Sequence, residues 1–419
     1  MIDEHDNERT SANTLRLLVL SSDTFVPTRV DVAVLFGEEL AGRGHQIDWI
    51  LQSGESCDES YQAEWGGGTV IVGATDLRPT LIGRIRKHLL DVRNDFAALS
   101  LCREKKYDIV QVKDKFLAGI LGIWLARVNG AKLVYWLSWP FPEESLTQWR
   151  DRTARYPILY LMRGIAFKFL LYRLILPSAT HVFVQSAQMR RDIAAEGIPP
   201  EKMTAVPMGV KIKNFRAVQR QTTTAALIPE EDIAIVYLGI LIRLRRLDFL
   251  IRVLALVLER LPKAKLYLVG SGGDPSDERY LRDEAATLGV TQSVVFTGQR
   301  PWHEALRYVE EATVCVSPFY PTPVLNSTSP TKLVEYMAVG RPVVANDHPE
   351  QRLLIEESGA GLCVPWNETD FADAIIRIVE NRELAERMAE AGPPYVAKNR
   401  EYRIIADAVE SEFRKIAEK

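Results

Sequence analysis

The chain has 419 residues, of which 47% are apolar, 26% charged and 9% aromatic. This composition excludes a largely disordered chain, and the length favours two domains over one compact core. Lysine and arginine number 52 against 55 aspartates and glutamates, so the formal charge of -3 excludes the global positive field that gathers nucleic acid.

Short apolar runs alternate with helical stretches from residue 15 onward. The runs lie at 15–20, 46–51, 68–74, 107–112, 131–138 and 181–186. Apolar strands that alternate with helices are typical of a parallel sheet covered on both faces. Residues 15–210 are therefore predicted to form an N-terminal Rossmann-like domain. The polar, acid-rich residues 1–14 are expected to be a disordered lead-in and not a secretory signal.

A second series of strands and helices follows a connector. Residues 211–232 are rich in Thr, Gln and Ala with weak periodicity, which predicts a linker. The alternation then restarts, which predicts a second Rossmann-like domain over 233–395. A Pro-Pro pair is expected to precede a last amphipathic helix within 396–419, free to pack on either domain, including back on the first. The fold class expected is α/β, with two parallel sheets that face an interdomain cleft.

The cysteines and histidines show no metal-ligand spacing. The four cysteines lie far apart without a CxxC pair, which indicates a reducing compartment and not a disulfide framework. We therefore expect a cytoplasmic protein without a bound metal.

The stretch from Ser329 to Asp347 carries the most informative pattern. Ser329 is a favoured N-cap residue, Pro330 suits the first helical position, and Gly340 is expected to end the helix. This predicts a helix N-terminus directly after an apolar strand, where free backbone amides and the helix dipole favour a phosphate group. Thr331 lies at that terminus.

Charged side chains accompany this helix start. Lys332 adds a positive charge beside the amides, and Glu335 lies more than one turn inside the helix. Glu335 is either a solvated residue of a capped helix or a carboxylate placed to accept bonds from two vicinal ribose hydroxyls. Arg243, Arg245 and Arg246 lie in a loop between an apolar strand and a helix. Such a loop suits a leaving diphosphate, because a guanidinium binds phosphate oxygens bidentately, although a solvated basic loop is the alternative.

The segment SPTKLVEYMAVGRPVVAND resembles the donor-site motif of retaining glycosyltransferases of the family 4 type, which have the GT-B fold, in the branch that makes polysaccharides and lipid-linked glycans. The family motif is Glu, seven residues, Glu. Glu335 matches the second acid, which implies that it binds the nucleotide ribose. The first acid falls on Ser327, so the sugar contact is expected from Asn326, Ser327, Thr328 or backbone groups.

The resemblance extends over most of the chain. MTAVPMGVKIKNF resembles the exit from the first domain, and VYLGILIRLRRLDFLI resembles the segment that clamps the donor diphosphate. In that segment Ile240 replaces the usual Arg and Arg245 falls on the usual Lys, with Arg243 and Arg246 close enough to compensate. The resemblance further assigns Gly270, Gly272, Gln299 and Arg300 to the donor, and the helix start adds Ser329 and Thr331 to the expected donor-binding residues.

The acceptor side is predicted at strand ends of the first domain. The loop SSDTFVPTRV lacks the paired glycines of the family, and Thr28 and Arg29 occupy that region. Two further loops carry the other acceptor-side residues, which are Lys113, Asp114, Ser138, Trp139 and Glu143. Trp139 either stacks on a sugar or is buried beside a proline. Asp114 or Glu143 is the candidate to assist the acceptor hydroxyl.

Residues 152–176 contain five cations and no acid. A membrane span is excluded, because each cation at mid-bilayer costs about 2.5–3.5 kcal/mol and together they cancel the apolar gain. Two interpretations remain. The stretch is either a surface element whose basic side chains snorkel to an anionic leaflet, making the protein peripheral on the inner face of the membrane, or a core helix with paired arginines.

The resemblance implies a retaining transfer with a nucleotide-diphosphate sugar as co-substrate and no other cofactor. No Asp-x-Asp sequence is present, so the diphosphate is expected to be neutralised by Arg245, Lys332 and the helix dipole in place of a divalent metal. The implied acceptor is a glycan or a polyprenyl-linked lipid, and nucleic acid is not expected as a partner. A nucleotide-sugar 2-epimerase of the same fold and a non-catalytic nucleotide-binding partner subunit stay open as alternatives.

Overall fold

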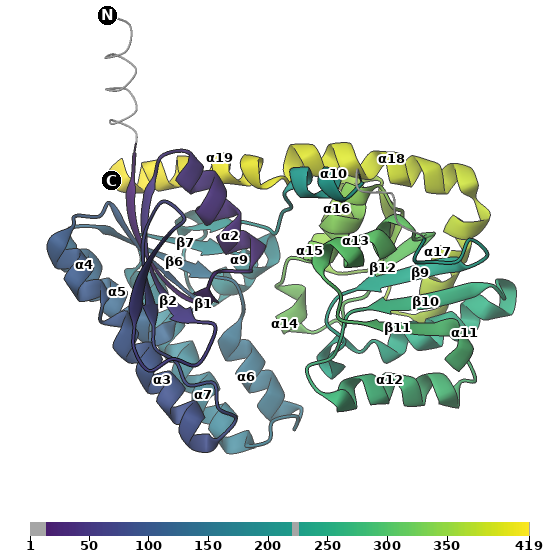
Figure 1. The fold of residues 1–419 in the computed structure, drawn as a ribbon, viewed down its shortest axis with the longest axis horizontal. Coiled ribbons are helices and arrows are strands. Elements are labelled where there is room, and N and C mark those ends of the chain that lie inside the picture. Colours follow the sequence, from purple (N-terminus) through teal and green to yellow (C-terminus); the bar gives the residue numbers. More distant parts are fainter. Residues whose placement is uncertain (1–13, 220–225, 419) are drawn as a thin grey trace, which may run out of the picture. The chain divides into compact units, whose positions relative to one another are not determined.

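The computed structural model describes residues 14–219 and 226–418 (Figure 1). The chain divides into two compact units, Met1–Pro207 with Tyr402–Lys419, and Met208–Glu401. The predicted lead-in falls, apart from residue 14, outside the described residues. Each unit is an α/β layer structure around its own sheet, as the alternating pattern predicted.

The first unit is built on an eight-stranded sheet in the order β3-β4-β2-β1-β5-β6-β7-β8. Neighbouring strands are parallel except for β3 and β4, which form an antiparallel hairpin at one edge. The strands are Arg16–Phe25 (β1), Gln46–Ser53 (β2), Tyr61–Trp65 (β3), Gly68–Gly73 (β4), Ile109–Lys113 (β5), Lys132–Leu137 (β6), His181–Val184 (β7) and Met203–Ala205 (β8). The central strands read as continuous apolar runs because helices cover both faces.

Helices pack on both faces of this sheet. They are Val30–Ala33 (α2), Leu81–Asp95 (α3), Ala98–Glu104 (α4), Phe116–Asn129 (α5), Phe141–Arg150 (α6), Pro157–Phe169 (α7), Leu176–Ser178 (α8), Ala187–Ala195 (α9) and Tyr402–Glu418 (α19), with π-helical turns at Leu35–Leu40 (η1) and Leu170–Ile175 (η2) and a 3-10 turn at Pro200–Lys202 (η3). Leu17 and Val19 of β1 share one buried cluster with Phe413 of α19, whereas Leu18 and Leu20 face the other cluster. The last helix thus completes the first unit.

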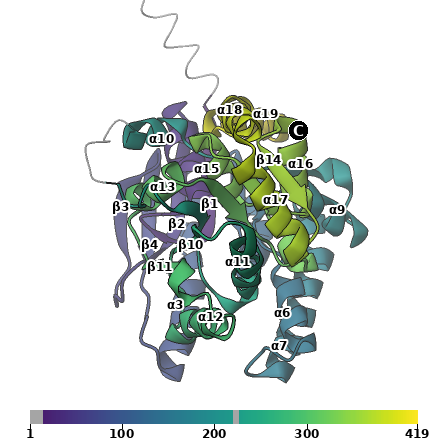
Figure 2. The same ribbon diagram turned by 90° about the vertical axis from the view of Figure 1, so that its right-hand side faces the viewer.

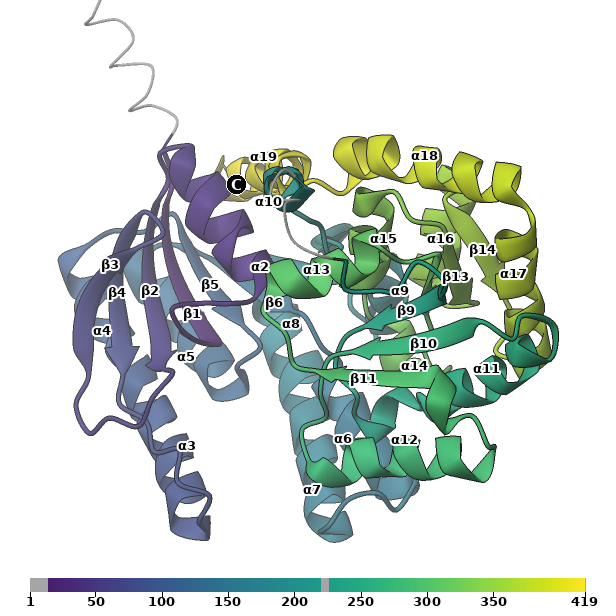
Figure 3. The ribbon, with the colours of Figure 1, turned by 45° about the vertical axis from the view of Figure 1, so that its right-hand side comes forward.

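The second unit has a six-stranded, fully parallel sheet in the order β11-β10-β9-β12-β13-β14 (Figure 3). Its strands are Ile233–Leu238 (β9), Ala264–Val269 (β10), Val294–Gly298 (β11), Val314–Ser317 (β12), Val343–Asn346 (β13) and Gly361–Val364 (β14). Its helices are Ile212–Gln219 (α10), Asp248–Arg260 (α11), Pro275–Thr287 (α12), Trp302–Glu310 (α13), Pro323–Asn326 (α14), Thr331–Val339 (α15), Pro349–Ser358 (α16), Glu368–Glu380 (α17) and Arg382–Asn399 (α18), with 3-10 turns at Arg243–Arg245 (η4) and Thr291–Ser293 (η5).

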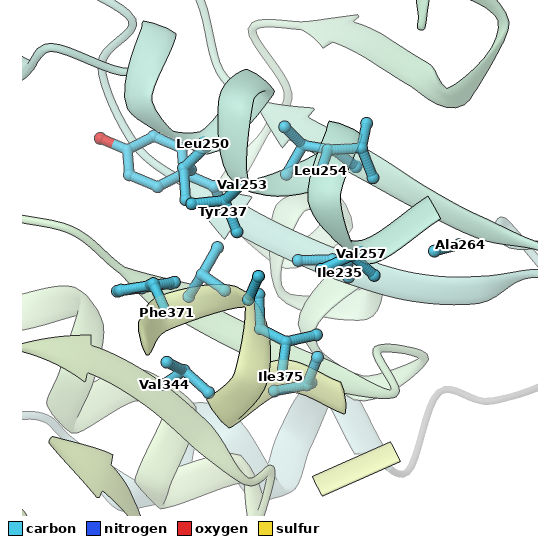
Figure 4. Packing of buried hydrophobic residues seen from close by; sticks show 14 of the residues in the cluster. Ile235, Tyr237, Leu250, Val253, Leu254, Val257, Ala264, Val344, Phe371 and Ile375 are labelled. Carbon is cyan, nitrogen blue, oxygen red and sulfur yellow. The ribbon is translucent and has the colours of Figure 1, made fainter. Parts of the chain in front are cut away.

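One of the two apolar clusters of the second unit lies between its sheet and two helices. Helices α11 and α17 lie side by side (Figure 2). Figure 4 shows Leu250 and Val257 of α11 gathered with Phe371 and Ile375 of α17 around Ile235 of β9. The packing of α11 and α17 on β9 holds this strand in place, and it thereby fixes the position of the loop that follows the strand.

Two local predictions were wrong. Part of the expected linker, 211–232, folds as α10, where Phe215 is buried in the apolar cluster on the other face of the second sheet, with Ala234 and Val236 of β9. The Pro-Pro pair, Pro393 and Pro394, lies inside α18, and the chain leaves the helical conformation only at Arg400. The proline side of α18 packs close to α15, with Gly392 next to the backbone of Met337, so tertiary packing outweighs the local cost of the prolines.

Both sheets share one topology. Apart from the β3 edge and the β8 extension, each has the order 3-2-1-4-5-6 of a doubly wound sheet, which places the switch point between β1 and β5 in the first unit and between β9 and β12 in the second. Ligands of such sheets bind beyond the carboxyl ends of the strands at the switch point. The candidate site of each unit is therefore expected there.

Candidate functional site

Two cations meet on aromatic rings at the switch point of the second unit. Lys332, in the first turn of α15, donates a 2.8 Å hydrogen bond from Nζ to the Tyr237 hydroxyl and lies 4.1 Å from the centre of the Tyr237 ring. The Arg245 guanidinium lies 4.9 Å from the centre of the Phe319 ring, and the Lys332 ammonium lies 5.3 Å from the same ring. Both charges are thus positioned by rings and not by carboxylates.

The electrostatics of this pair favour an anion. Burial lowers the pKa of Lys332 well below its usual value, and the nearby positive charge of Arg245 lowers it further. Within the described residues, the buried Nη1 atom of Arg245 has no hydrogen-bond partner. Two close cations with an unused donor are stabilised by a bound dianion such as a diphosphate, which supplies both the charge and the acceptor oxygens.

Glu335 follows Lys332 by three residues, almost one turn further along α15. Its Oε1 accepts a 3.4 Å hydrogen bond from Nε1 of Trp302, at the start of α13. Burial raises the pKa of Glu335 to about 7, although the Trp302 bond and the charge of Lys332 act in the opposite direction. A half-buried carboxylate with free acceptor capacity can accept bonds from two vicinal hydroxyls.

The start of α15 differs from the prediction. Pro330, and not Ser329, occupies the N-cap position, and among the described residues no side chain caps the first turn. Ser329 Oγ instead accepts a 2.9 Å hydrogen bond from the backbone N–H of Met208. By sequence, the helix could begin with either Ser329 or Pro330 at the N-cap position. The contact with Met208 engages the Ser329 side chain and leaves Pro330 at that position. The first amides of α15, near Thr331, therefore stay available to a ligand. Gly340 ends the helix with a φ of 80°, as predicted.

The residues at the sugar position lie at the end of the short helix α14. The Oγ of Ser327 donates to the carbonyl of Pro323 at 3.2 Å, and the Oγ1 of Thr328 donates to the carbonyl of Leu325 at 2.7 Å. Of the described side chains here, Asn326 has a buried Oδ1 without a hydrogen-bond partner. Asn326 thus has an acceptor atom that is both buried and unused.

The other two arginines of the η4 loop have different partners. Arg246 forms a 3.3 Å ion pair with the buried carboxylate of Asp248 and lies 5.2 Å from the Tyr320 ring centre. Arg243 lies 5.0 Å from the ring centre of Tyr280. The expectation that these two compensate for Ile240 therefore finds no support in their contacts, because each is drawn to a neighbour on another element.

Two glycines shape the backbone beside the cations. Gly239 and Gly270 have φ values of 146° and 145°, which disfavour any other residue. A Cβ on Gly270 would lie 2.1 Å from the carbonyl oxygen of Gly239, so the loops after β9 and β10 approach at van der Waals distance. Gly272 lines a surface pocket with Asp274 and Arg279. Gln299 and Arg300 are exposed, and Arg300 donates to the carbonyl of Thr297 at 3.1 Å.

A second cluster of charges lies at the switch point of the first unit. Lys113, at the end of β5, is 1% exposed and lies 3.2 Å from Asp23, 3.7 Å from Asp31 and 3.3 Å from Asp114. Arg29 lies over the same acids, with its closest contact of 2.9 Å to Asp31. Of the predicted acceptor-side residues, this cluster contains Arg29, Lys113, Asp114 and Ser138.

Asp114 connects this cluster to Ser138. Its φ of 57° is rare for a residue other than glycine, and its carboxylate accepts bonds from the Ser138 backbone N–H at 2.8 Å and from the Ser138 hydroxyl. Arg29 Nη1 donates to the same hydroxyl at 3.2 Å. Burial opposes the charge of Arg29, but the carboxylates of Asp31, Asp114 and Asp23 outweigh it and raise the pKa of the guanidinium. Arg29 is the exposed tip of an otherwise buried network.

Three predicted acceptor-side residues lie outside this network. The Glu143 carboxylate does not contact the network and instead accepts a 3.0 Å hydrogen bond from the Tyr172 hydroxyl. Burial raises the pKa of Glu143. Trp139 donates from Nε1 to Glu144 at 2.7 Å. Thr28 is exposed. Of the two acids predicted to assist the acceptor, Asp114 belongs to the charged network and Glu143 does not.

The sequence matches two glycosyltransferase family models. The model described as glycosyl transferases group 1 matches residues 232–381, and the model described as glycosyltransferase family 4 matches residues 31–214. The two matches together span most of the chain: the first lies within the second unit, and the second lies in the first unit except for its last residues. The chain belongs to the glycosyltransferases of the family 4 type.

This glycosyltransferase has curated relatives of moderate identity. It is 28% identical over 207 residues to D-inositol 3-phosphate glycosyltransferase of Stackebrandtia nassauensis, which covers 48% of this chain and 46% of that protein. It is 23% identical over 291 residues to alpha-monoglucosyldiacylglycerol synthase of Streptococcus pneumoniae, which covers 67% and 60%. The chain thus spans about half of the length of the curated relatives it matches, 46% and 60% in these two.

Solved structures show the same fold. Sucrose-phosphate synthase from Thermosynechococcus elongatus aligns with a TM-score of 0.72 at 20% identity, covering 96% of this chain and 99% of that chain. The glycosyltransferase therefore has the two-domain GT-B fold. Among its described helices, none has the length and apolar content needed to cross a membrane.

Proposed function

We propose that this glycosyltransferase moves a sugar from a nucleotide-diphosphate sugar to a glycan or polyprenyl-linked acceptor, with retention of anomeric configuration, in the synthesis of cell-surface polysaccharide. The arrangement that carries the proposal is the pair Arg245 and Lys332 on the Phe319 ring, with Glu335 next to it on α15. The two cations and the free amides of α15 match the phosphates of a nucleoside diphosphate, and the carboxylate further along the helix matches its ribose.

Each residue has a role in this proposal. Arg245 and Lys332 stabilise the negative charge that grows on the diphosphate as its bond to the sugar breaks. The acceptor hydroxyl attacks the anomeric carbon from the face that the diphosphate leaves, and a leaving phosphate oxygen takes the hydroxyl proton. Glu335 accepts bonds from the ribose. The protein thus contributes positioning and charge and forms no covalent bond to the sugar.

We further propose that no metal ion and no additional cofactor take part. Two cations and the amides of α15 neutralise the diphosphate, which is the task that a divalent ion performs in other transferases. On the acceptor side, the Arg29–Asp114 network presents a guanidinium to the acceptor. The name of the diacylglycerol synthase relative indicates a lipid acceptor in that protein, which supports a lipid-linked acceptor here.

The experiment that tests this function measures nucleotide release from a panel of nucleotide sugars with chelator present. The reactions are run with and without a polyprenyl-linked acceptor extract, and Lys332→Met serves as the inactive comparison. We expect release from one donor that depends on the acceptor and survives the chelator. Release that requires added Mg²⁺ would contradict the metal-independent mechanism.

Two other outcomes distinguish the alternatives. Nucleotide binding without release from any donor would favour a non-catalytic partner subunit, an alternative supported by Ser327 at the position of the first acid. Conversion of the donor to an epimer without acceptor would favour a 2-epimerase.

A further inference from the structure

Helix α3 exposes aliphatic side chains at its N-terminal end. The Thr80 side chain caps the helix by accepting from the Gly83 N–H at 3.0 Å, so the helix begins firmly at residue 81. Leu81 is 75% exposed, Ile82 74% and Ile85 52%. Large aliphatic residues in such a cluster are unusual on a surface that meets only water.

Helix α7 shows the same feature. Ile158 is 74% exposed, Leu159 60% and Met162 64%. The turn that follows, η2, is instead buried through residues such as Leu171 and Ile175. The stretch 152–176 therefore has two parts. Its second part, η2, contributes side chains to the core, and its first part, α7, lies on the surface.

The topology of the first unit brings the two exposed ends to one side. Helix α3 begins shortly after the carboxyl end of β4, and α6 begins directly after the carboxyl end of β6. Helix α7 packs along α6 as a hairpin whose turn lies away from the sheet. Figures 1, 2 and 3 show α3 and the α6–α7 hairpin extending past the same end of the sheet. The carboxyl ends of the strands, where the Arg29–Asp114 network lies, face this same end.

Cations accompany the apolar side chains on both helices. The first ten residues of α3, LIGRIRKHLL, contain three cations and no acid, and α7 contains Arg163 and Lys168 and no acid. Acids do approach from neighbouring elements: Arg86 pairs with Asp58 at 2.9 Å, and Lys168 pairs with Glu196 at 2.6 Å. Arg84 and Lys87 remain exposed on α3.

We propose that α3 and α7 form a two-helix surface that docks this protein on an anionic lipid bilayer. The six residues Leu81, Ile82, Ile85, Ile158, Leu159 and Met162 enter the acyl boundary, and the neighbouring cations contact the headgroups. A second copy of the chain is the poorer occupant, because α7 and the first ten residues of α3 hold no acid that could pair with these cations across a symmetric contact. The proposal goes beyond the proposed function, since it assigns a surface, and it places the acceptor-side network near the lipid.

The test uses vesicles and matched variants of the full chain. Binding is measured by co-sedimentation with vesicles of phosphatidylglycerol and phosphatidylcholine, and with phosphatidylcholine alone. The test variant is Ile82→Glu with Ile158→Glu, and the control is Leu353→Glu, which places the same change on a 39% exposed leucine of the second unit. Circular dichroism and nucleotide affinity confirm that each variant is folded.

We expect the native chain and the control to bind the anionic vesicles, and the double variant to bind at least about tenfold more weakly. Raising the salt to about 0.5 M should weaken the binding of the native chain, because exposed charges are then screened. Equal binding by the native chain and the double variant, or no binding by either, overturns the proposal. Light scattering that shows a dimer dissociated by the double variant would assign the surface to a second copy. Because nucleotide affinity is measured separately, failure here leaves the proposed function standing.

Discussion

The ionisation of Glu335 should control how nucleotide affinity depends on pH. Its pKa is raised to about 7 by burial, and the charged carboxylate accepts stronger bonds from the two ribose hydroxyls than the neutral acid does. Affinity should therefore rise with pH through neutrality. Lys332 acts in the opposite sense, because its pKa is lowered by burial and by Arg245 and its charge is lost as the pH rises. The complete profile should be bell-shaped.

The rise of affinity on the acidic side of this profile, called the acid limb below, has a size that follows from the pKa of Glu335. A carboxyl group with a pKa of about 7 is roughly 9% ionised at pH 6 and roughly 91% ionised at pH 8. If only the ionised form binds, the dissociation constant should fall by about tenfold over this interval, or about 1.4 kcal/mol. The linked effect on stability has the opposite sign. Because the folded protein holds this proton more tightly than the unfolded chain, the carboxyl contributes less stability as pH rises toward 7.

Isothermal titration with a nucleoside diphosphate between pH 5.5 and pH 9 measures this profile. The variant Glu335→Gln should lose the acid limb and bind weakly at every pH, because its neutral amide keeps the shape but not the charge. Lys332→Arg should keep the acid limb and lose the alkaline limb, since a guanidinium stays charged. A flat profile in the native chain, or an unchanged acid limb in Glu335→Gln, would refute the reasoning.

Three further predictions concern the residues that hold the two sites. Lys113→Met should lower the free energy of unfolding by about 3–5 kcal/mol, because it removes the buried cation among Asp23, Asp31 and Asp114 and leaves only the partly exposed Arg29 to pair with them. Urea titration should show about 0.5 kcal/mol or less for the exposed control Lys415→Met, and similar losses in both would contradict this. Gly270→Ala should lower the free energy of unfolding by about 1–3 kcal/mol and weaken nucleotide binding, since its Cβ would overlap the Gly239 carbonyl. In the same thermal scan the control Gly42→Ala, whose Cβ would have no such neighbour within 4 Å, should be as stable as the native chain. Trp302→Phe removes a bond that lowers the pKa of Glu335, so its acid limb in the calorimetric profile should move to higher pH, and a move to lower pH would exclude this role.

The sequence by itself determined the architecture and the position of helix α15. Apolar runs such as 15–20 and 131–138 became buried parallel strands, because a strand covered on both faces is apolar along most of its length. Gly340 ended α15 because a glycine adopts positive φ without strain. Lys332 and Glu335 could be placed on that helix because their spacing is local.

Contacts between distant parts of the chain were decided only by the tertiary structure. The aromatic residues Tyr237 and Phe319 that position Lys332 carry no sequence signal for that role, since each also reads as a core residue. Trp302 reaches Glu335 from a helix that begins 33 residues earlier. Local rules also failed where packing opposed them, as at Ser329, which bonds to Met208 in place of capping α15. Sequence patterns report the state of neighbouring residues, whereas these partners are set by how strands and helices pack, and that depends on the whole fold.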